Sequence, residues 1–311
     1  MAKYRINLPQ LSGNLFLTDG GFETTLVFHE GLELPEFAAF TQLKTEEGRK
    51  AMNNYFDRYA RIATSNGLGF VLEAPTWRAN PDWAAKIGYS PKELDKVNRD
   101  AIVFMEHIRE RHETMYSKMP ISGSIGPQDD GYKPSSFMSM EEAKKYHQTQ
   151  INTFKETAAD FITSFTICYV EEAIGIARAA KNAEMPVVIG FTVETDGNLP
   201  SGQTLKEAIE QVDRETKEIP IYYMINCAHP THFMNVLTGD NWLSRIHAIR
   251  ANSSKMSHKE LDNAEELDEG NPQELGEEYL TLRSKLPNLN ILGGCCGTDH
   301  RHVESICRAI C

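Results

Sequence analysis

Three cysteines in this sequence each follow an apolar run, at a point where the end of a strand can present a thiol. Cys295 and Cys296 follow residues 289–294, and Cys227 follows residues 221–226. Three thiolates that meet at one place form a zinc site with an open fourth position. A sulfur-rich shell favours a soft fourth ligand such as another thiol, which zinc keeps ionised at neutral pH. The pattern predicts a Zn²⁺ centre that activates a substrate thiol rather than water.

A structural role for these cysteines is the alternative. A free cysteine is often buried as a small hydrophobic residue, and any one of the three alone fits that role. A disulfide between Cys295 and Cys296 is disfavoured, because bonding adjacent residues strains the geometry. The shared position of all three cysteines favours zinc. His229, two residues after Cys227, is a further ligand candidate, although histidines in loops are usually solvated.

Eight apolar runs typical of buried strands alternate with segments of helical periodicity. The expected strands, some with their end turns, lie at residues 16–21, 68–72, 120–127, 160–166, 186–192, 221–226, 245–250 and 289–292. The expected helices lie at residues 45–66, 92–112, 140–159, 171–183, 205–216 and 273–286, and a last helix has His300 and His302 in its first turn. The polar stretch at residues 255–270 is expected to be a surface loop. This order predicts a single-domain (β/α)₈ TIM barrel of parallel strands over residues 1–311.

A barrel of this kind collects the carboxyl ends of its strands on one face, where active sites of TIM barrels lie. The residues at those ends are polar or able to bind metals, and they come from every part of the chain: Asp19, Glu23, Thr76, Gly126, Thr192, Asn226, Cys227, Asn252, Cys295 and Cys296. The predicted fold therefore brings the three cysteines together with a set of polar groups that can hold a small substrate.

Composition limits the classes of partner. The 311 residues carry a formal net charge of −12 and show no basic stripe, which argues against nucleic acid as a partner. No apolar stretch is long enough to span a membrane, and the N-terminus lacks the apolar core of a signal peptide. The six cysteines show no spacing typical of a disulfide scaffold, which fits a reducing cytosol. We therefore expect a cytoplasmic protein; its oligomeric state stays open.

The sequence resembles the homocysteine S-methyltransferase family, zinc-dependent barrels that methylate homocysteine to methionine. The resemblance runs nearly end to end and is strongest at the pair Asn226-Cys227 and residues 293–298. It implies that Zn²⁺ is bound, and the reaction catalysed, by Cys227, Cys295 and Cys296. It also implies substrate contacts, carried by matching strand-end positions, at Asp19, Gly20, Gly21, Thr24, Thr76, Asn226 and Asn252.

One position departs from the family pattern. A glutamate that helps to hold the substrate amine usually ends the fourth strand, and Phe165 stands there in this sequence. A charge-assisted hydrogen bond is stronger than the attraction of an ammonium group to a ring face. Phe165 therefore predicts weaker homocysteine binding than in relatives with glutamate, or a thiol whose amine is absent or differently placed. Replacing Phe165 by glutamate is expected to tighten homocysteine binding.

Two function hypotheses follow, from different classes. The first is a zinc-dependent methyltransferase that moves a methyl group from S-methylmethionine, S-adenosylmethionine or betaine to homocysteine. Such donors already carry the charge of the leaving group, so no general acid is needed, and no His–carboxylate pair is evident. The alternative is a barrel that binds zinc or an amino-thiol but has an altered thiol substrate or no methyl transfer. A cobalamin- or folate-dependent module is disfavoured because few residues follow Cys296.

Overall fold

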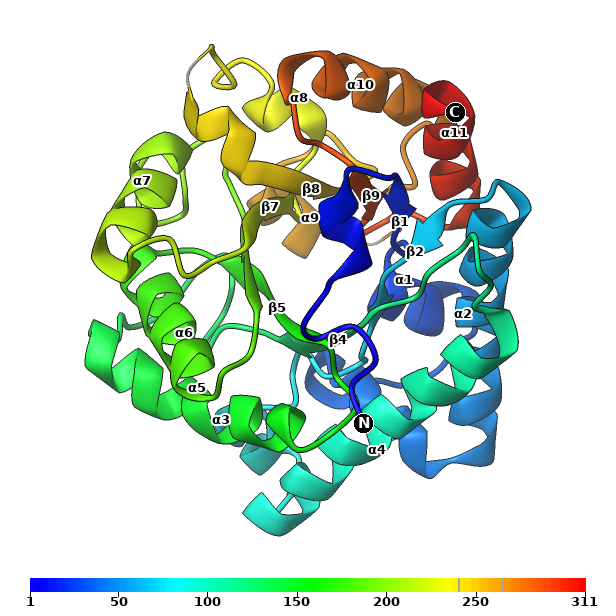
Figure 1. The fold of residues 1–311 in the computed structure, drawn as a ribbon, viewed down its shortest axis with the longest axis vertical. Coiled ribbons are helices and arrows are strands. Elements are labelled where there is room, and N and C mark those ends of the chain that lie inside the picture. The colour runs from blue at the N-terminus through cyan, green and yellow to red at the C-terminus, as the bar shows by residue number, and fades with distance from the viewer. Residues whose placement is uncertain (240, 265) are drawn as a thin grey trace.

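A closed barrel of parallel strands forms the centre of the molecule (Figure 1). The structure is a computed structural model that describes residues 1–239, 241–264 and 266–311. The strands are β1 (Phe16–Leu17), β2 (Gly69–Phe70), β3 (Leu72–Glu73), β4 (Ile121–Ile125), β5 (Phe161–Ile167), β6 (Val187–Phe191), β7 (Tyr222–Asn226), β8 (Ile246–Ala251) and β9 (Ile291–Gly294). Their order in the sheet is β2-β1-β9-β8-β7-β6-β5-β4-β3.

The barrel closes through one segment that pairs in two directions. Strands β2 and β3 are consecutive pieces of that segment, separated only by Val71. Leu17 of β1 pairs with Phe70 of β2, whereas Leu72 of β3 pairs with Ile121 of β4. The nine strands therefore correspond to the eight predicted from the apolar runs, and the predicted (β/α)₈ fold is confirmed.

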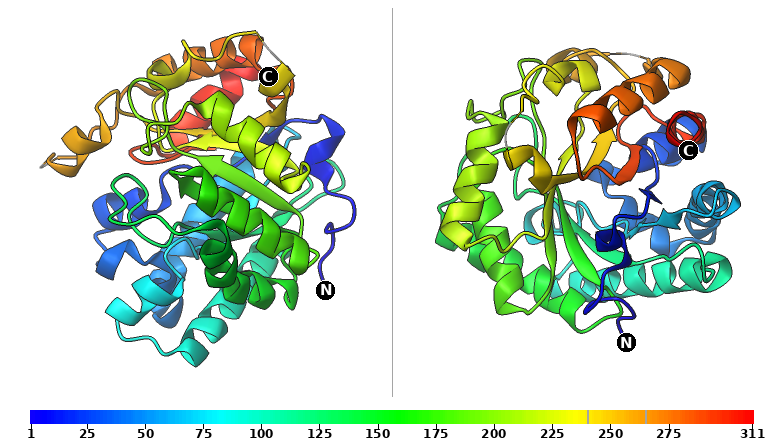
Figure 2. Two further views of the ribbon diagram at one scale, coloured as in Figure 1. Left: turned by 90° about the vertical axis from the view of Figure 1, so that its left-hand side faces the viewer. Right: turned by 45° about the horizontal axis from the view of Figure 1, so that its top comes forward.

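Helices surround the sheet on all sides, as the two views of Figure 2 also show. The α-helices are α1 (Phe22–Thr24), α2 (Glu46–Ser65), α3 (Pro81–Lys86), α4 (Pro91–His112), α5 (Met140–Lys155), α6 (Val170–Asn182), α7 (Leu205–Thr216), α8 (Pro230–Phe233), α9 (His258–Asp262), α10 (Pro272–Lys285) and α11 (His300–Ile310). Short 3₁₀-helices are η1 (Pro9–Ser12), η3 (Pro35–Phe37), η4 (Ala39–Lys44) and η5 (Asn241–Arg245), and η2 (Thr25–His29) is a π-helix. All seven long helices expected from the sequence are present.

Local side-chain chemistry sets the ends of these helices. The hydroxyl of Ser90 accepts a hydrogen bond from the backbone N–H of Glu93, whose carboxylate accepts one in return from the backbone N–H of Ser90; this capping box starts α4. Helix α5 ends at Lys155, four residues before the predicted end. The guanidinium of Arg5 donates hydrogen bonds to the carbonyl groups of Lys155 and Ala159, so a distant arginine satisfies groups that a longer helix would have paired.

The N-terminal segment closes the amino end of the barrel. Leu8 and Gln10 are buried, and Leu8 packs against the side chains that fill the barrel interior, which include Phe16, Phe161 and Tyr222. The side-chain amide of Asn290, just before β9, donates a hydrogen bond to the carbonyl group of Gln10. In the left view of Figure 2 this segment and α9 lie at opposite ends of the molecule. Access to the barrel interior is therefore confined to the carboxyl ends of the strands.

The stretch at residues 255–270, apart from residue 265, is more structured than the predicted surface loop. It contains α9, which starts with a capping box between Ser257 and Glu260. His258 on this helix is buried, because it packs over the carboxyl end of the barrel. The sequence showed weak periodicity here because a five-residue helix is too short to repeat its apolar face.

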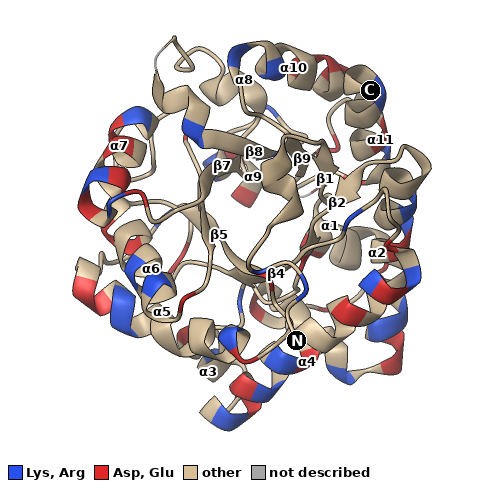
Figure 3. Ribbon diagram, viewed as in Figure 1, with Lys and Arg blue, Asp and Glu red and all other residues tan. Residues whose placement is uncertain are grey.

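Charged side chains are scattered over the outer helices, with both signs interspersed (Figure 3). No helix in the described residues is long and apolar enough to cross a membrane. Inside the barrel, by contrast, the charged residues Asp19, Glu73 and Arg250 are buried near the carboxyl ends of the strands.

Candidate active site

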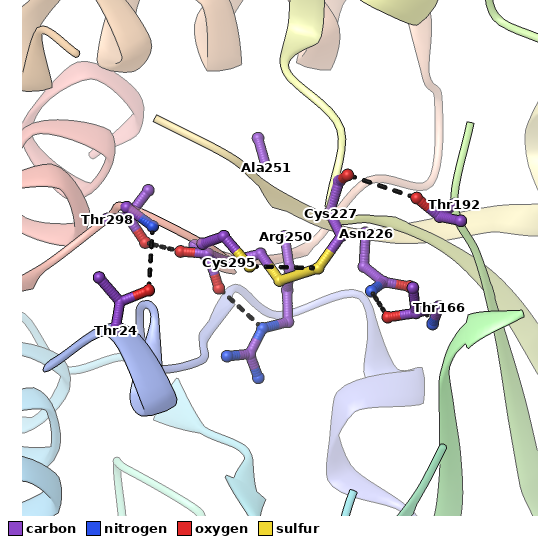
Figure 4. The surroundings of a disulfide bond; sticks show 12 residues. Thr24, Thr166, Thr192, Asn226, Cys227, Arg250, Ala251, Cys295 and Thr298 are labelled. Atoms are coloured by element: carbon purple, nitrogen blue, oxygen red, sulfur yellow. Dashed lines mark hydrogen bonds between the residues drawn. A yellow bond between two sulfur atoms is a disulfide. The ribbon is translucent and has the colours of Figure 1, made fainter. Parts of the chain in front are cut away.

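The three cysteines predicted to act together converge at the carboxyl end of the barrel. Cys227 follows β7, and Cys295 and Cys296 follow β9; their sulfur atoms all lie within 4.8 Å of one another. Cys227 and Cys295 are joined by a disulfide bond, and the Cys296 sulfur is 3.9 Å from that of Cys227 (Figure 4). The structure therefore has this sulfur centre in an oxidised form with one free thiol. Cys295 and Cys296 are not bonded to each other, as expected.

Backbone hydrogen bonds between neighbouring strand ends place the cysteines. The N–H of Cys227 donates to the carbonyl group of Arg250 at 3.0 Å, and the N–H of Cys295 donates to that of Ala251 at 2.7 Å. A Cβ atom on Gly294 would lie 2.0 Å from the Thr298 hydroxyl oxygen, so only glycine lets the β9 end turn here. The Gly-Gly-Cys-Cys stretch therefore has a steric reason for its glycines.

The donor set fits one zinc ion once the disulfide is reduced. Tetrahedral Zn–S bonds of 2.3 Å hold two sulfur atoms about 3.8 Å apart. The Cys227–Cys296 sulfur separation of 3.9 Å is close to that value, and the third sulfur lies within 4.8 Å. The Cys296 side chain is exposed, and a free cysteine thiol with its usual pKa of about 8.5 is mostly protonated at neutral pH. A bound cation is therefore needed to make this thiol a thiolate at neutral pH.

A cavity of about 100 Å³ leads to the sulfur atoms. Its walls include five of the seven residues that the resemblance assigned to the substrate, namely Asp19, Gly20, Gly21, Thr24 and Asn226. Thr76 and Asn252 are buried behind the walls instead. The Thr76 hydroxyl donates a 2.7 Å hydrogen bond to the carbonyl group of Ser124, which gives it a structural role. Their use as direct substrate contacts has no support in the cavity geometry.

Two of the wall residues are already engaged by protein groups. The side-chain amide of Asn226 donates to the Thr166 hydroxyl and accepts from the Thr166 backbone N–H, both at 3.0 Å. These bonds hold Thr166 at a positive φ of 60°, which is uncommon for a β-branched residue. Thr24 accepts a hydrogen bond from the Gly297 N–H. Both side chains therefore position the cavity wall.

Arg250 at the end of β8 is a site residue that the sequence analysis did not single out. Its guanidinium forms an ion pair with Asp19 at 2.7 Å and donates hydrogen bonds to the carbonyl groups of Gly20 and Gly294. The Tyr55 hydroxyl donates a 2.9 Å hydrogen bond to Asp19 as well. Asp19 is thus neutralised by a protein cation and is a poor partner for a substrate ammonium group.

Two further carboxylates, Glu23 and Glu73, line the same cavity. Glu73 accepts hydrogen bonds from the hydroxyls of Ser124 at 3.1 Å and Thr163 at 3.3 Å. Burial raises the pKa of Glu73 to about 7, although the charge of Arg250 partly opposes the rise. Burial likewise raises the pKa of Glu23 to about 7. The sequence analysis did not single out Glu73. It directly follows the predicted strand 68–72, and this place at a strand end could have identified it as a site residue.

Phe165 lies on the cavity wall, as its predicted place at a strand end requires. Its side chain is largely buried, and the Arg250 guanidinium carbon lies 5.3 Å from the centre of its ring. A buried cation beside a ring face is a favourable arrangement. The aromatic ring therefore makes a cation–π contact with Arg250 of the protein itself, and the cavity wall at this position carries no negative charge.

Two aromatic side chains from loops and α9 cover the sulfur centre. The rings of Tyr132 and His258 are 4.1 Å apart. Tyr132 lines the cavity together with Cys296, and the Nε2 atom of His258 lies 2.6 Å from the carbonyl oxygen of Cys227. Neither residue follows a predicted strand or belongs to a periodic segment, so neither could be predicted as a site residue from the sequence.

The other histidines have structural roles. His229 is buried rather than solvated; it caps α8, and its Nε2 atom is 3.3 Å from the Glu278 carboxylate. Burial lowers the pKa of His229 to about 4. It does not belong to either group of potential metal ligands in the described chain. His300 and His302 lie in the first turn of α11, as predicted.

Known proteins of similar sequence and structure are homocysteine methyltransferases. The sequence profile of the family "Homocysteine S-methyltransferase" matches residues 16–310. Homocysteine S-methyltransferase 1 of Brassica oleracea var. italica is 23% identical over 334 residues, which cover 97% of this chain and 95% of that protein.

Two solved structures of the homocysteine methyltransferase MmuM from Escherichia coli share the fold. The oxidised form superposes with a TM-score of 0.77 at 15% identity and covers 98% of this chain and 99% of its own. The metallated form gives a TM-score of 0.73 at 16% identity, with 94% and 95% covered. The fold and the cysteine-lined cavity define a TIM barrel with a thiol centre. With the profile match over nearly its whole length, the chain belongs to the homocysteine S-methyltransferase family.

Proposed function

We propose that this protein transfers a methyl group from a sulfonium or betaine-type donor to the thiol of homocysteine, giving methionine. The observation that carries the proposal is the convergence of Cys227, Cys295 and Cys296 in a cavity of a barrel that belongs to this family. A thiol bound in this cavity would lie next to these sulfur atoms, where the substrate to be methylated has to be.

Zinc is the metal that best fits the sulfur donors of Cys227, Cys295 and Cys296 in their reduced form. The similar protein MmuM is known in a metallated form, which supports a metal at this place. When bound, zinc lowers the pKa of the substrate thiol and so supplies the thiolate nucleophile. Because the disulfide removes two of the three thiolates, we expect the protein to take up zinc only after reduction.

The residues of the chain orient the reactants and exclude water. The first loop, at Gly20 and Gly21, approaches the cysteines so closely that a Cβ atom on Gly21 would lie 2.7 Å from the carbonyl oxygen of Cys295. Tyr132 and His258 cover the sulfur atoms from the other side. Holding the thiol and the donor's methyl group in line raises the rate, because it lowers the entropic cost of reaching the transition state.

The walls also favour a cationic methyl donor. Trp77, Tyr132 and Phe165 present aromatic side chains to the cavity, and Glu23 and Glu73 present carboxyl groups. Aromatic faces and carboxylates both attract a sulfonium or quaternary ammonium group. S-methylmethionine, S-adenosylmethionine and betaine all carry such a group, and their departure as neutral molecules needs no general acid.

The alternative is a barrel that binds zinc or an amino-thiol with an altered substrate or without methyl transfer. Phe165 at the position of the family glutamate is the observation that favours it. The two functions are distinguished by measuring methionine formation with reduced, zinc-loaded protein, homocysteine and each of the three donors in turn. Methionine from any donor supports the methyltransferase. If the protein binds homocysteine but turns over none of the donors, the methyltransferase proposal is wrong and the alternative holds.

A further inference from the structure

The cavity contains more negative than positive charge. Three carboxyl groups, from Asp19, Glu23 and Glu73, line it, whereas Arg250 is the single arginine or lysine on its walls in the described part of the chain. Arg250 already forms an ion pair with Asp19 at 2.7 Å. The carboxyl groups of Glu23 and Glu73 therefore have no ion-pair partner among the described contacts, although the charge of Arg250 acts on both. A buried carboxylate in this situation is stabilised when a cationic group of a ligand arrives.

Glu73 is the better placed of these two groups to bind a fixed cation. Its two oxygens each accept one hydrogen bond, from the hydroxyls of Ser124 and Thr163, and these contacts fix its direction. A carboxylate offers about four acceptor positions, so each oxygen keeps room for an N–H donor. By contrast, Glu23 has no side-chain hydrogen bond among the described contacts, and its charge acts on the Cys296 thiol.

Glu73 also lies beside the position where the carboxylate expected from the resemblance is absent. Thr163, its hydrogen-bond donor, precedes Phe165 by two residues on β5, so the side chains of Thr163 and Phe165 leave the strand on the same side. Arg250 interacts with both Glu73 and the Phe165 ring. A ligand group that would have faced a carboxylate at position 165 can therefore meet Glu73 two strands away.

We propose that Glu73 binds the ammonium group of the amino-acid thiol, in place of the glutamate at whose position Phe165 stands. The inference deepens the proposed function, on which it rests. It assigns specificity for an α-amino thiol to β3 rather than to the end of β5. The protein therefore selects homocysteine over the same thiol acid without its amine.

The test compares two ligands that differ only in the amine. Binding of homocysteine and of 4-sulfanylbutanoate to reduced, zinc-loaded protein is measured by calorimetry for the wild type, Glu73→Gln, Glu73→Asp and Glu23→Gln, at equal zinc content. A charge-assisted hydrogen bond corresponds to about 10- to 100-fold in affinity. We expect Glu73→Gln to weaken homocysteine binding by that factor and to change 4-sulfanylbutanoate binding by less than about threefold. Glu73→Asp, which keeps the charge, should retain part of the preference for homocysteine.

Several outcomes would overturn the assignment. Equal weakening of both ligands in Glu73→Gln would show a structural role, and loss of the preference in Glu23→Gln alone would transfer the role to Glu23. A wild type that binds both ligands equally would remove the assignment to Glu73 but leave thiol methylation standing. A wild type that binds neither thiol would overturn the proposed function itself, and the assignment with it.

Discussion

The two ends of the cavity are built in different ways. At the sulfur end, Cys227 and Cys295 are placed by backbone hydrogen bonds between the ends of neighbouring strands. On the opposite wall, Glu73 is held by side-chain contacts with Ser124 and Thr163. Backbone bonds depend on the barrel and little on residue type, whereas side-chain contacts change with a single substitution. The chemistry of the thiol is therefore tied to the fold, and recognition of the rest of the substrate is free to vary.

The largest effect is expected at the sulfur end. Cys296→Ser removes one of three thiolates, so the reduced protein should lose bound zinc. Losing a residue that only supports a metal ligand costs up to about a hundredfold, so losing a ligand itself should lower methionine formation by more than that. The fold should survive, since Cys296 lies at the cavity and not among the core residues. Zinc content by mass spectrometry and methionine formation measure the result.

Cys307→Ser is the matched control for that variant, because Cys307 is a buried cysteine on α11 remote from the cavity lining. It should keep its zinc. Full zinc retention in reduced Cys296→Ser would refute the three-cysteine site.

On β8, which lies between the two strands that end at the cysteines, Arg250→Met should cost mainly stability. It leaves Asp19 buried without its cation, and breaking a buried ion pair in this way costs about 3–5 kcal/mol. Urea unfolding measures the loss, and adding Asp19→Asn should restore much of it. The control Arg245→Met breaks the more exposed pair with Asp213 and should cost less. Equal losses in the two arginine variants would contradict the buried-pair account.

The charge on Glu73 should also make stability depend on pH. Its pKa rises from 4.5 to about 7 on folding. Its protonated form is therefore favoured in the folded protein, and the stability it contributes is complete below pH 4.5 and lost as the pH rises to about 7. The difference amounts to about 3 kcal/mol. Ligand-free Glu73→Gln should match the wild type near pH 4.5 and exceed it in unfolding free energy near pH 8; parallel curves would contradict this.

The smallest effect is expected from Phe165→Glu. If Glu73 already binds the ammonium group, the tightening expected from the sequence should shrink to less than about threefold in the wild type. In the Glu73→Gln background the same change should recover about tenfold in homocysteine affinity, the scale of one charge-assisted hydrogen bond. Calorimetry on the four variants of this cycle measures both effects. A tenfold gain in homocysteine affinity from Phe165→Glu alone would show that the ammonium group lies at position 165 rather than at Glu73.

The backbone-determined part of the molecule is also the part that the sequence predicted. Strands buried on both sides read as apolar runs, so all eight were found, and their carboxyl ends brought Cys227, Cys295 and Cys296 together. Arg250 and Glu73 end two of those strands, but a charged residue at a strand end does not tell which partner it meets. Tyr132 and His258 come from segments without periodicity, so their arrival over the sulfur atoms depends on tertiary packing alone.

The N-terminal segment under the barrel has a consequence for the kinetics. Because Leu8 and Gln10 fill the amino end, two substrates share one entrance at the carboxyl end. A thiol bound at the cysteines has to be reached by its methyl donor through this same entrance. It is expected to enter first, and its methylated product to leave last. With S-adenosylmethionine or betaine as donor, product-inhibition patterns should therefore be those of an ordered sequential mechanism, with methionine competing against homocysteine alone.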